Sequence, residues 1–287
     1  MKRENVITLL VLAAQRLARA GCDSPILDAE ILLAHALRQN RAWLYAHPTN
    51  IPTQSHLDEF CNLLARREQR EPVAYLVGHK EFFALDFEVT PHVLIPRPDT
   101  ELLVETAIAM NNEQIKGGGR IVDVGTGSGC IAVTLAKHLP AARLIAVDRS
   151  VAALSVARRN AVRHEVMDRI SFVSGDLLQA LTGPFEMIVS NPPYVSRAEL
   201  ADTSPEVDQY EPHLALNGGK DGLNIVRRLL TQGQAKLKPG GSLLVEIGAA
   251  QGNAVTHLAQ THFPQATISL KKDLAGRDRL LVVTSPS

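Results

Sequence analysis

The chain has 287 residues, and its 30 Lys plus Arg balance 30 Asp plus Glu, so the formal net charge is zero. This length allows a full α/β domain together with a smaller one. The lack of a basic excess argues against a protein that lives on nucleic acid and must neutralise phosphates. Three widely spaced cysteines indicate a reducing compartment and exclude a thiolate cluster, and ten histidines without paired spacing predict no metal site.

The N-terminal segment superficially resembles a secretory signal, because Lys2 and Arg3 precede the apolar run 6–14. Arg16 and Arg19, however, occupy the region where a cleavage site should be neutral. The spacing of the apolar residues instead predicts an amphipathic first helix of a cytoplasmic protein, with its apolar stripe at Leu9, Leu10, Ala13 and Leu17. No other apolar segment is long enough to span a bilayer, so we expect no membrane association.

Residues 1–72 are predicted to form a small helical domain. Ser24 and Pro25 have the N-cap and N1 pattern of a second helix, and Thr53 is a candidate cap for a further one. A bundle of this size is better suited to docking a substrate than to catalysis. A local basic cluster is expected to lie in solvent at a helix C-terminus: Arg66, Arg67 and Arg70.

Residues 73–98 are predicted to link the two domains through a β-hairpin, because apolar and polar residues alternate over 82–89. The Pro-bracketed stretch 94–101 spans the end of this linker and the start of the larger domain, which we place at 99–287. Asp99 or Thr100 is the expected N-cap of its first helix. Capping leaves Arg97 unexplained, so we hypothesise that this stretch lines the substrate entrance.

A glycine-rich turn follows the apolar strand 120–122 and precedes the helical run 130–139. Strand, glycine turn and helix form the context in which such a motif binds a ligand at the helix N-terminus. Cys130 stands where the dinucleotide fingerprint requires its last glycine, which favours a nucleoside cofactor without a pyrophosphate. The candidate cofactor-binding residues of this turn are Gly125, Thr126, Gly127, Ser128 and Gly129.

Two acidic residues end the next two predicted strands. Asp148 lies about 20 residues beyond the glycines, where a carboxylate accepts from ribose hydroxyls; its alternative role is N-cap of the helix 151–163, which Ser150 can fill equally well. Asp176 is placed to accept from the amino group of an adenine, and the backbone N–H of Leu177 to contact a ring nitrogen. Taken alone, Asp176 is more often an ordinary loop acid.

The sequence Asn191-Pro192-Pro193-Tyr194 directly follows the buried-strand pattern 185–190. Open α/β sheets bind ligands at this end of their strands. The prolines fix their own φ angles and donate no N–H, so the Pro192 carbonyl is expected to project beside the Asn191 amide oxygen. Two acceptors suit an incoming NH2 group, and Tyr194 offers a flat face for stacking. A strand-ending turn with Tyr194 in the core is the alternative interpretation.

The rest of the chain predicts further strands at 242–247, 266–271 and 280–284, the last two as an antiparallel pair at a sheet edge. The stretch 195–222 shows no periodicity and is rich in Pro and Gly. A loop of that length is usually functional or disordered, and we expect it to fold over the acceptor.

Taken together, these motifs resemble those of Rossmann-like S-adenosylmethionine-dependent methyltransferases. Residues 191–194 match the motif shared by DNA amino-methylating enzymes and protein-glutamine methyltransferases. Nearly the whole chain is similar to the release-factor glutamine methyltransferases, most specifically at 94–101 and also at 27–30, 32–35, 220–223 and 273–279. The resemblance implies a seven-stranded Rossmann-like α/β sheet with a helical N-terminal domain. Leu177 departs from family members that carry an aromatic residue under the adenine, so adenine would rest on an aliphatic surface here.

The resemblance further implies methyl transfer from S-adenosylmethionine, with S-adenosylhomocysteine as product and no metal, to the glutamine of the Gly-Gly-Gln loop in class I peptide-chain release factors. Asn191, Pro192, Pro193 and Tyr194 would be the catalytic residues, with Asn191 also beside the cofactor. The alternative is methylation of adenine N6 or cytosine N4 in DNA, which zero net charge disfavours because base flipping needs a grip on phosphates. A non-catalytic nucleoside-binding protein is the third possibility.

Overall fold

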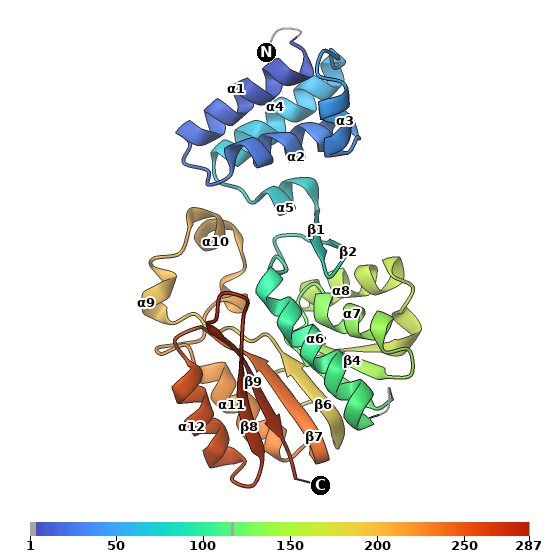
Figure 1. The fold of residues 1–287 in the computed structure, drawn as a ribbon, viewed down its shortest axis with the longest axis vertical. Coiled ribbons are helices and arrows are strands. Elements are labelled where there is room, and N and C mark those ends of the chain that lie inside the picture. The colour runs from blue at the N-terminus through green and yellow to red at the C-terminus, as the bar shows by residue number, and fades with distance from the viewer. Residues whose placement is uncertain (1–3, 116–117, 287) are drawn as a thin grey trace. The chain divides into compact units, whose positions relative to one another are not determined.

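The computed structural model describes residues 4–115 and 118–286, and Figure 1 shows its elements. Lys2 and Arg3, which entered the signal-peptide argument, lie outside the described residues. The chain divides into two compact units: one comprises residues up to 79 together with 204–210, and the other comprises 80–203 and 211 to the end. Within the described part of the chain, no helix is long and apolar enough to cross a membrane.

The first unit is a helical bundle with a core of its own. As predicted, Thr53 caps a helix with its side chain, whereas Ser24 precedes Pro25 without a side-chain capping bond. The apolar stripe of the first helix is buried at Leu9, Ala13 and Leu17. The helices of this unit are α1 (Val6–Arg19), α2 (Pro25–Leu37), α3 (Arg41–Ala46), α4 (Gln54–Glu68), α5 (Val73–Val77) and α10 (Pro205–Tyr210).

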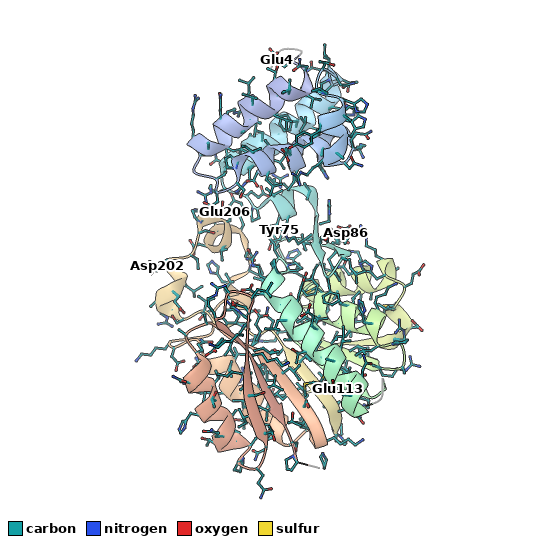
Figure 2. All side chains as sticks on the ribbon, viewed as in Figure 1. Glu4, Tyr75, Asp86, Glu113, Asp202 and Glu206 are labelled. Atoms are coloured by element: carbon teal, nitrogen blue, oxygen red, sulfur yellow. The ribbon has the colours of Figure 1, made fainter. Side chains whose placement is uncertain are left out.

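The predicted solvated basic cluster is wrong for Arg67. This side chain is buried and forms ion pairs with Asp28 at 2.8 Å and with Glu206 at 3.0 Å. Arg70 contacts the same Glu206 carboxylate at 2.6 Å, and Glu206 is labelled on α10 in Figure 2. Because a buried guanidinium needs paired acceptors, acids that are distant in sequence determine its environment, and local helix-end rules do not.

The predicted hairpin is confirmed as strands β1 (His79–Phe82) and β2 (Leu85–Glu88), which form a two-stranded sheet. Phe83 and Ala84 make its turn with φ angles of 52° and 57°. Two successive positive φ angles give the turn twist that matches paired strands. Phe82 and Phe87 are fully buried and belong to a core cluster of the second unit.

The second unit is built on a seven-stranded sheet with the order β5-β4-β3-β6-β7-β9-β8. Neighbours from β5 to β7 pair in parallel, and β9 pairs antiparallel with both β7 and β8, so the predicted antiparallel edge pair is confirmed. The strands are β3 (Arg120–Val124), β4 (Arg143–Asp148), β5 (Ile170–Ser174), β6 (Phe185–Ser190), β7 (Leu237–Glu246), β8 (Thr267–Lys272) and β9 (Asp278–Thr284).

Helices cover both faces of this sheet, as expected for buried parallel strands. Neighbouring strand residues point to opposite faces: Ile121 packs in one core cluster with side chains of α6 and α7, and Val122 packs in the other with side chains of α11 and α12. These helices are visible on either side of the strands in Figure 1. The helices of this unit include α6 (Glu101–Met110), α7 (Cys130–His138), α8 (Val151–Arg163), α11 (Asn224–Gln234) and α12 (Gly252–His262).

The segment 195–222 was expected to be an irregular loop, but it contains short helices. Besides α10, these are α9 (Arg197–Leu200) and a 3-10 turn at His213–Ala215. Ser196 and Glu199 form a reciprocal capping box that stabilises α9. Helices of three to six residues are too short to show a periodic apolar pattern, which explains why the sequence did not reveal them.

Candidate functional site

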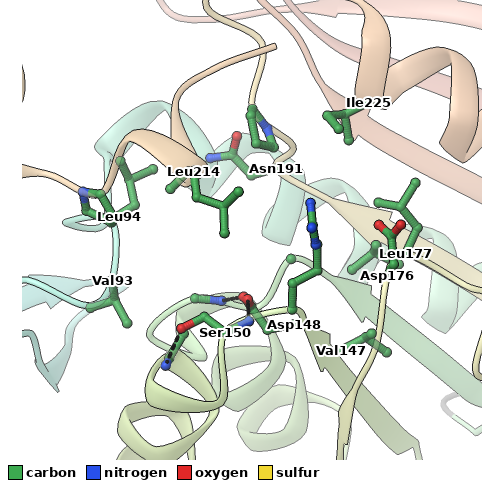
Figure 3. Close-up of a pocket in the computed structure, with 18 of the residues that line it drawn as sticks. Val93, Leu94, Val147, Asp148, Ser150, Asp176, Leu177, Asn191, Leu214 and Ile225 are labelled. Carbon is green, nitrogen blue, oxygen red and sulfur yellow. Dashed lines mark hydrogen bonds between the residues drawn. The ribbon is translucent and has the colours of Figure 1, made fainter. Parts of the chain in front are cut away.

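A cavity of about 440 Å³ opens in the second unit, at the carboxyl ends of the parallel strands β3, β4, β5 and β6. Its volume falls within the range of roughly 300–1,000 Å³ that is typical of small-molecule sites. In Figure 3, Asp148 and Asn191 lie on opposite sides of the cavity, with Asp176 and Leu177 along a third side. The strand ends that the sequence identified therefore meet in one place.

The glycine turn forms the floor beside β3. Gly125, Gly127 and Gly129 all have positive φ angles, which favour glycine. A Cβ on Gly125 would have no neighbour within 4 Å, whereas a Cβ on Gly129 would meet the Ala157 Cβ at 3.0 Å. Gly125 and Gly127 therefore border the cavity, and Gly129 instead allows α7 to pack closely on α8.

Thr126 and Ser128, also predicted to bind the cofactor, are buried beneath the turn and do not belong to the cavity wall. The Thr126 hydroxyl donates to Asp123 at 2.6 Å, and the same carboxylate oxygen accepts from the Ala132 backbone at 3.2 Å. Burial raises the pKa of Asp123 to about 7. Asp123 thus holds the glycine turn and the start of α7 together through these two hydrogen bonds. The sequence analysis did not identify this role, although an acid near the end of a predicted strand was a signal for it.

Asp148 is a member of the cavity wall whose carboxylate is already partly engaged. One oxygen accepts from the Gly127 N–H at 2.9 Å, and the other accepts from the Ser150 N–H at 2.8 Å (Figure 3). Ser150, whose hydroxyl accepts from Ala153, is the N-cap of α8. Burial raises the pKa of Asp148, and these backbone donors oppose the shift. Each carboxylate oxygen still has a lone pair for a ligand hydroxyl.

Asp176 and Leu177 border the cavity next to each other at the end of β5. The Asp176 carboxylate contacts Arg228 at 2.5 Å, a partner that the sequence did not indicate. Leu177 is nearly buried and has a φ of 55°. This left-handed backbone turns the chain sharply at the cavity and brings an aliphatic surface to its wall, beside Val147.

Only part of the motif 191–194 lies in the cavity wall. Asn191 and Pro193 line the cavity, whereas Pro192 and Tyr194 are outside the set of lining residues. The Asn191 Nδ2 donates to the Thr100 hydroxyl at 3.0 Å. Among the described residues, no hydrogen bond engages the Asn191 side-chain oxygen or the Pro192 carbonyl. These are the two acceptors that the sequence predicted to be free.

Tyr194 is anchored by a carboxyl group at the end of β7. Its hydroxyl donates to Glu246 Oε1 at 3.3 Å, and burial raises the pKa of Tyr194 to about 12. Glu246 itself is 1% exposed, and burial raises its pKa to about 7. The sequence analysis did not identify Glu246. An acid at the end of an apolar strand was a signal that could have marked it as a residue near the site.

Thr100 occupies the N-cap position of α6, as one of the two predicted candidates, but it does not cap the helix with its side chain. The Thr100 backbone is already helical and its side chain makes no capping bond; its hydroxyl instead accepts from Asn191. The Asp99 carboxylate contacts Arg279 at 3.1 Å. The side chains of this turn are therefore committed to tertiary contacts rather than to the helix end.

Arg97, which had no explanation in the sequence, forms an ion pair with the buried Glu211. Glu211 also accepts from the Ile95 N–H at 3.4 Å. The pair ties the stretch before α6 to the residue that directly follows α10 in the segment 195–222. The residues beside it line the cavity from the two sides: Val93 and Leu94 on one, and Pro212, His213 and Leu214 on the other.

Within the described ranges, no group of three or more His, Cys, Asp or Glu side chains is arranged to hold a metal ion.

Comparison with known proteins gives consistent matches. Residues 8–78 match the family model described as the PrmC N-terminal domain, and residues 98–206 match the methyltransferase small domain. A release factor glutamine methyltransferase from Nitratidesulfovibrio vulgaris is 43% identical over 95% of this chain and 92% of its own. Another with that name, from Cereibacter sphaeroides, is 44% identical over 96% of both chains.

Among solved structures, a methyltransferase from Pyrococcus furiosus superposes with a TM-score of 0.53 at 20% identity. The match covers 79% of this chain and 99% of that one. At this level of identity the likeness concerns the fold, and it agrees with the seven-stranded sheet and its flanking helices.

Proposed function

The chain belongs to the release factor glutamine methyltransferase family, and we propose that it transfers a methyl group from S-adenosylmethionine to the side-chain amide nitrogen of a glutamine in a class I peptide-chain release factor. The observation that carries this proposal is that two oxygens have no hydrogen-bond partner among the described residues: Oδ1 of Asn191, which lines the cavity of the glycine turn, and the carbonyl of Pro192, which follows it. Family membership favours a protein glutamine over the amino group of a DNA base. A release factor as substrate would place the enzyme in the cytoplasm.

The residues around the cavity suit a nucleoside cofactor. Gly125 leaves open the space that a Cβ would fill, and Asp148 retains lone pairs for ribose hydroxyls. Asp176 and the Leu177 backbone would hold the adenine edge, with the Leu177 side chain against the ring. When bound, S-adenosylmethionine supplies a methyl group that is already electrophilic, so the chain needs no acid to activate a leaving group.

An amide nitrogen is a poor nucleophile because its lone pair is delocalised into the carbonyl. Asn191 Oδ1 and the Pro192 carbonyl would accept its two N–H hydrogens, which aims the nitrogen at the methyl group and stabilises the positive charge that develops there. Tyr194 would limit the plane in which the amide lies. The methylated nitrogen is acidic and releases one proton to water, so no strong base is required.

The proposal is tested with labelled S-adenosylmethionine and a purified class I release factor, wild type and with the glutamine of its Gly-Gly-Gln loop replaced by asparagine. We expect label in the wild-type factor and none in the variant, since the shorter side chain cannot reach both acceptors. Equal labelling of both factors would contradict the proposed acceptor. Labelling of DNA in a parallel reaction, in place of the factor, would support the DNA alternative instead.

A further inference from the structure

The loop that follows β5 is held by side chains from one face of helix α11. Arg228 Nη2 donates to the Asp176 carboxylate at 2.5 Å, across 52 residues of sequence. Gln232 accepts from the Leu178 N–H at 2.9 Å, and Lys236 donates to the Leu178 carbonyl at 2.5 Å. The three side chains are spaced by four residues, so Arg228 and Gln232 share one face of α11, and Lys236 follows just beyond the helix end. One helix therefore fixes the conformation of this loop.

The loop presents an acceptor and a donor next to each other at the cavity. Asp176 and Leu177 both line the cavity, as Figure 3 shows. The contact with Arg228 uses Asp176 Oδ2, and within the described part of the chain no hydrogen bond engages Asp176 Oδ1 or the Leu177 N–H. The following N–H, that of Leu178, is already bonded to Gln232. The groups left for a ligand are one carboxylate oxygen and the adjacent backbone N–H.

Adenine and hypoxanthine differ at the edge that such a pair of groups would contact. Adenine presents the hydrogens of its 6-amino group beside the acceptor nitrogen N1, which complements one acceptor and one donor. Hypoxanthine reverses both groups, with an oxygen at position 6 and a hydrogen on N1. It would set an oxygen against the carboxylate and an N–H against the Leu177 N–H, and polar groups left unpaired on binding are costly. An acceptor and a donor held in this order therefore select adenine.

This order depends on the Asp176 side chain staying at the cavity. Its side chain is 34% exposed, so without a partner it could rotate into water, where a carboxylate is well solvated. The Arg228 side chain is 39% exposed, and a surface ion pair of this kind adds little to folding stability. Its contribution is orientation. Ile225, in the first turn of α11, lines the same cavity, so the helix that supplies Arg228 is itself part of the cavity wall.

We propose that Arg228 is a specificity-determining residue of the cofactor site: it holds the Asp176 carboxylate where one oxygen accepts from the 6-amino group of adenine. The inference rests on the proposed function, because it concerns the base of the proposed cofactor. Arg228 is a positioning residue and acts through Asp176. A residue that only stabilised the fold would change the affinity for adenine and hypoxanthine ligands alike, whereas a residue that positions Asp176 changes the ratio of the two affinities.

The test is calorimetry of the full chain with S-adenosylhomocysteine and with S-inosylhomocysteine, which carries hypoxanthine in place of adenine. We expect wild type to bind S-adenosylhomocysteine roughly 100-fold or more tightly than the inosine compound, because two polar contacts are mismatched in the latter. R228M keeps the apolar stem of the side chain without its charge, and the ratio of affinities should fall to roughly tenfold or less. R228K keeps the charge and should restore most of the ratio.

Two further variants separate positioning from general damage. Arg163 forms a comparable exposed ion pair with Asp86 at 2.9 Å, and neither residue borders the cavity. R163M should therefore keep the wild-type affinity for both ligands. D176N should lose the preference for adenine, because Arg228 would engage the one amide oxygen and leave an NH2 facing the 6-amino group. Since Arg228 acts through Asp176, the double variant D176N/R228M should show no lower ratio than D176N alone.

The inference is overturned if R228M keeps the wild-type ratio, including the case in which both affinities fall equally. It is also overturned if wild type binds the two ligands equally, since the 6-amino group would then not be recognised. In either case, a wild-type enzyme that still labels the release factor leaves the proposed function standing. A wild-type enzyme that does not bind S-adenosylhomocysteine at all rejects the proposed cofactor, and this inference with it.

Discussion

The two ends of the cavity are constructed differently. At the glycine end, Asp148 is bonded to the backbone N–H groups of Gly127 and Ser150, so the fold itself holds the carboxylate. At the acceptor end, the Asn191 amide is bonded to a side chain, the hydroxyl of Thr100, at 3.0 Å. Backbone contacts persist as long as the strand and turn are folded, whereas a series of side chains depends on each rotamer in it.

This difference suggests that cofactor affinity and turnover can be changed separately. Substitutions at the glycine end should weaken cofactor binding and leave the acceptor geometry intact. Substitutions at the acceptor end should reduce kcat and leave cofactor binding intact. A residue that changed both to the same extent would show that the two ends are coupled.

The largest effect is expected for Asn191→Ala, which removes one of the two proposed acceptors of the transition state. By analogy with the loss of one pre-aligned donor from an oxyanion hole, we expect kcat to fall roughly 100-fold or more. Steady-state kinetics with a release factor would measure this fall, and calorimetry should show cofactor affinity close to that of wild type. Asn253→Ala, at an exposed position of α12, is the matched control. Undiminished turnover in Asn191→Ala would reject the catalytic role of Asn191.

A smaller effect is expected for Asp148→Ala, and it should appear in cofactor binding rather than in turnover. The variant loses the proposed acceptor of the ribose hydroxyls and also the hydrogen bond from the Gly127 N–H. The Kd for S-adenosylmethionine should therefore rise roughly 10- to 100-fold, the equivalent of one or two charge-assisted hydrogen bonds. At saturating cofactor, kcat should recover most of its wild-type value. Asp168→Ala, at an exposed position, should bind like wild type. A fall in kcat without a change in the Kd for S-adenosylmethionine would show that Asp148 acts on turnover, contrary to the proposed difference between the two ends of the cavity.

The sequence predicted the glycine end well because the information there is local. A strand, a glycine turn and an acid at the next strand end are each visible in short windows, and β3, β4 and the hairpin β1–β2 follow the expected patterns. The same local rules placed Thr100 at the N-cap of α6, but they could not show that its hydroxyl bonds Asn191 in place of the helix end.

The acceptor end could not be predicted in detail because its contacts are long-range. Thr100 and Asn191 are 91 residues apart, and Tyr194 and Glu246 are 52 apart. The ion pair of Asp176 with Arg228 also spans 52 residues. A motif shows which residue types are present, but only the packing of β6, β7 and the turn before α6 shows which of them face one another.

The smallest effect concerns stability, and it tests whether Glu246 is buried as described. Its pKa is raised from 4.5 to about 7, chiefly by burial. The folded protein therefore holds a proton that the unfolded chain releases near pH 4.5. The stabilisation from this group is fully present below about pH 4.5 and is lost as the pH rises through about 7. The E246Q variant has no such titration, because an amide does not ionise in this range.

We therefore expect the free energy of unfolding of wild type, minus that of E246Q, to decrease by on the order of 2 kcal/mol between pH 5 and pH 8. Asp123, whose pKa is also raised to about 7, contributes equally to both proteins and cancels in the difference. Denaturant unfolding at several pH values measures it. The control is Glu186→Gln: the Glu186 pKa is lowered, with hydrogen bonds from the Arg120 backbone and Lys238 outweighing burial, so its difference should stay flat over this range. A flat difference for E246Q as well would mean that water reaches the Glu246 carboxyl and that burial does not raise its pKa.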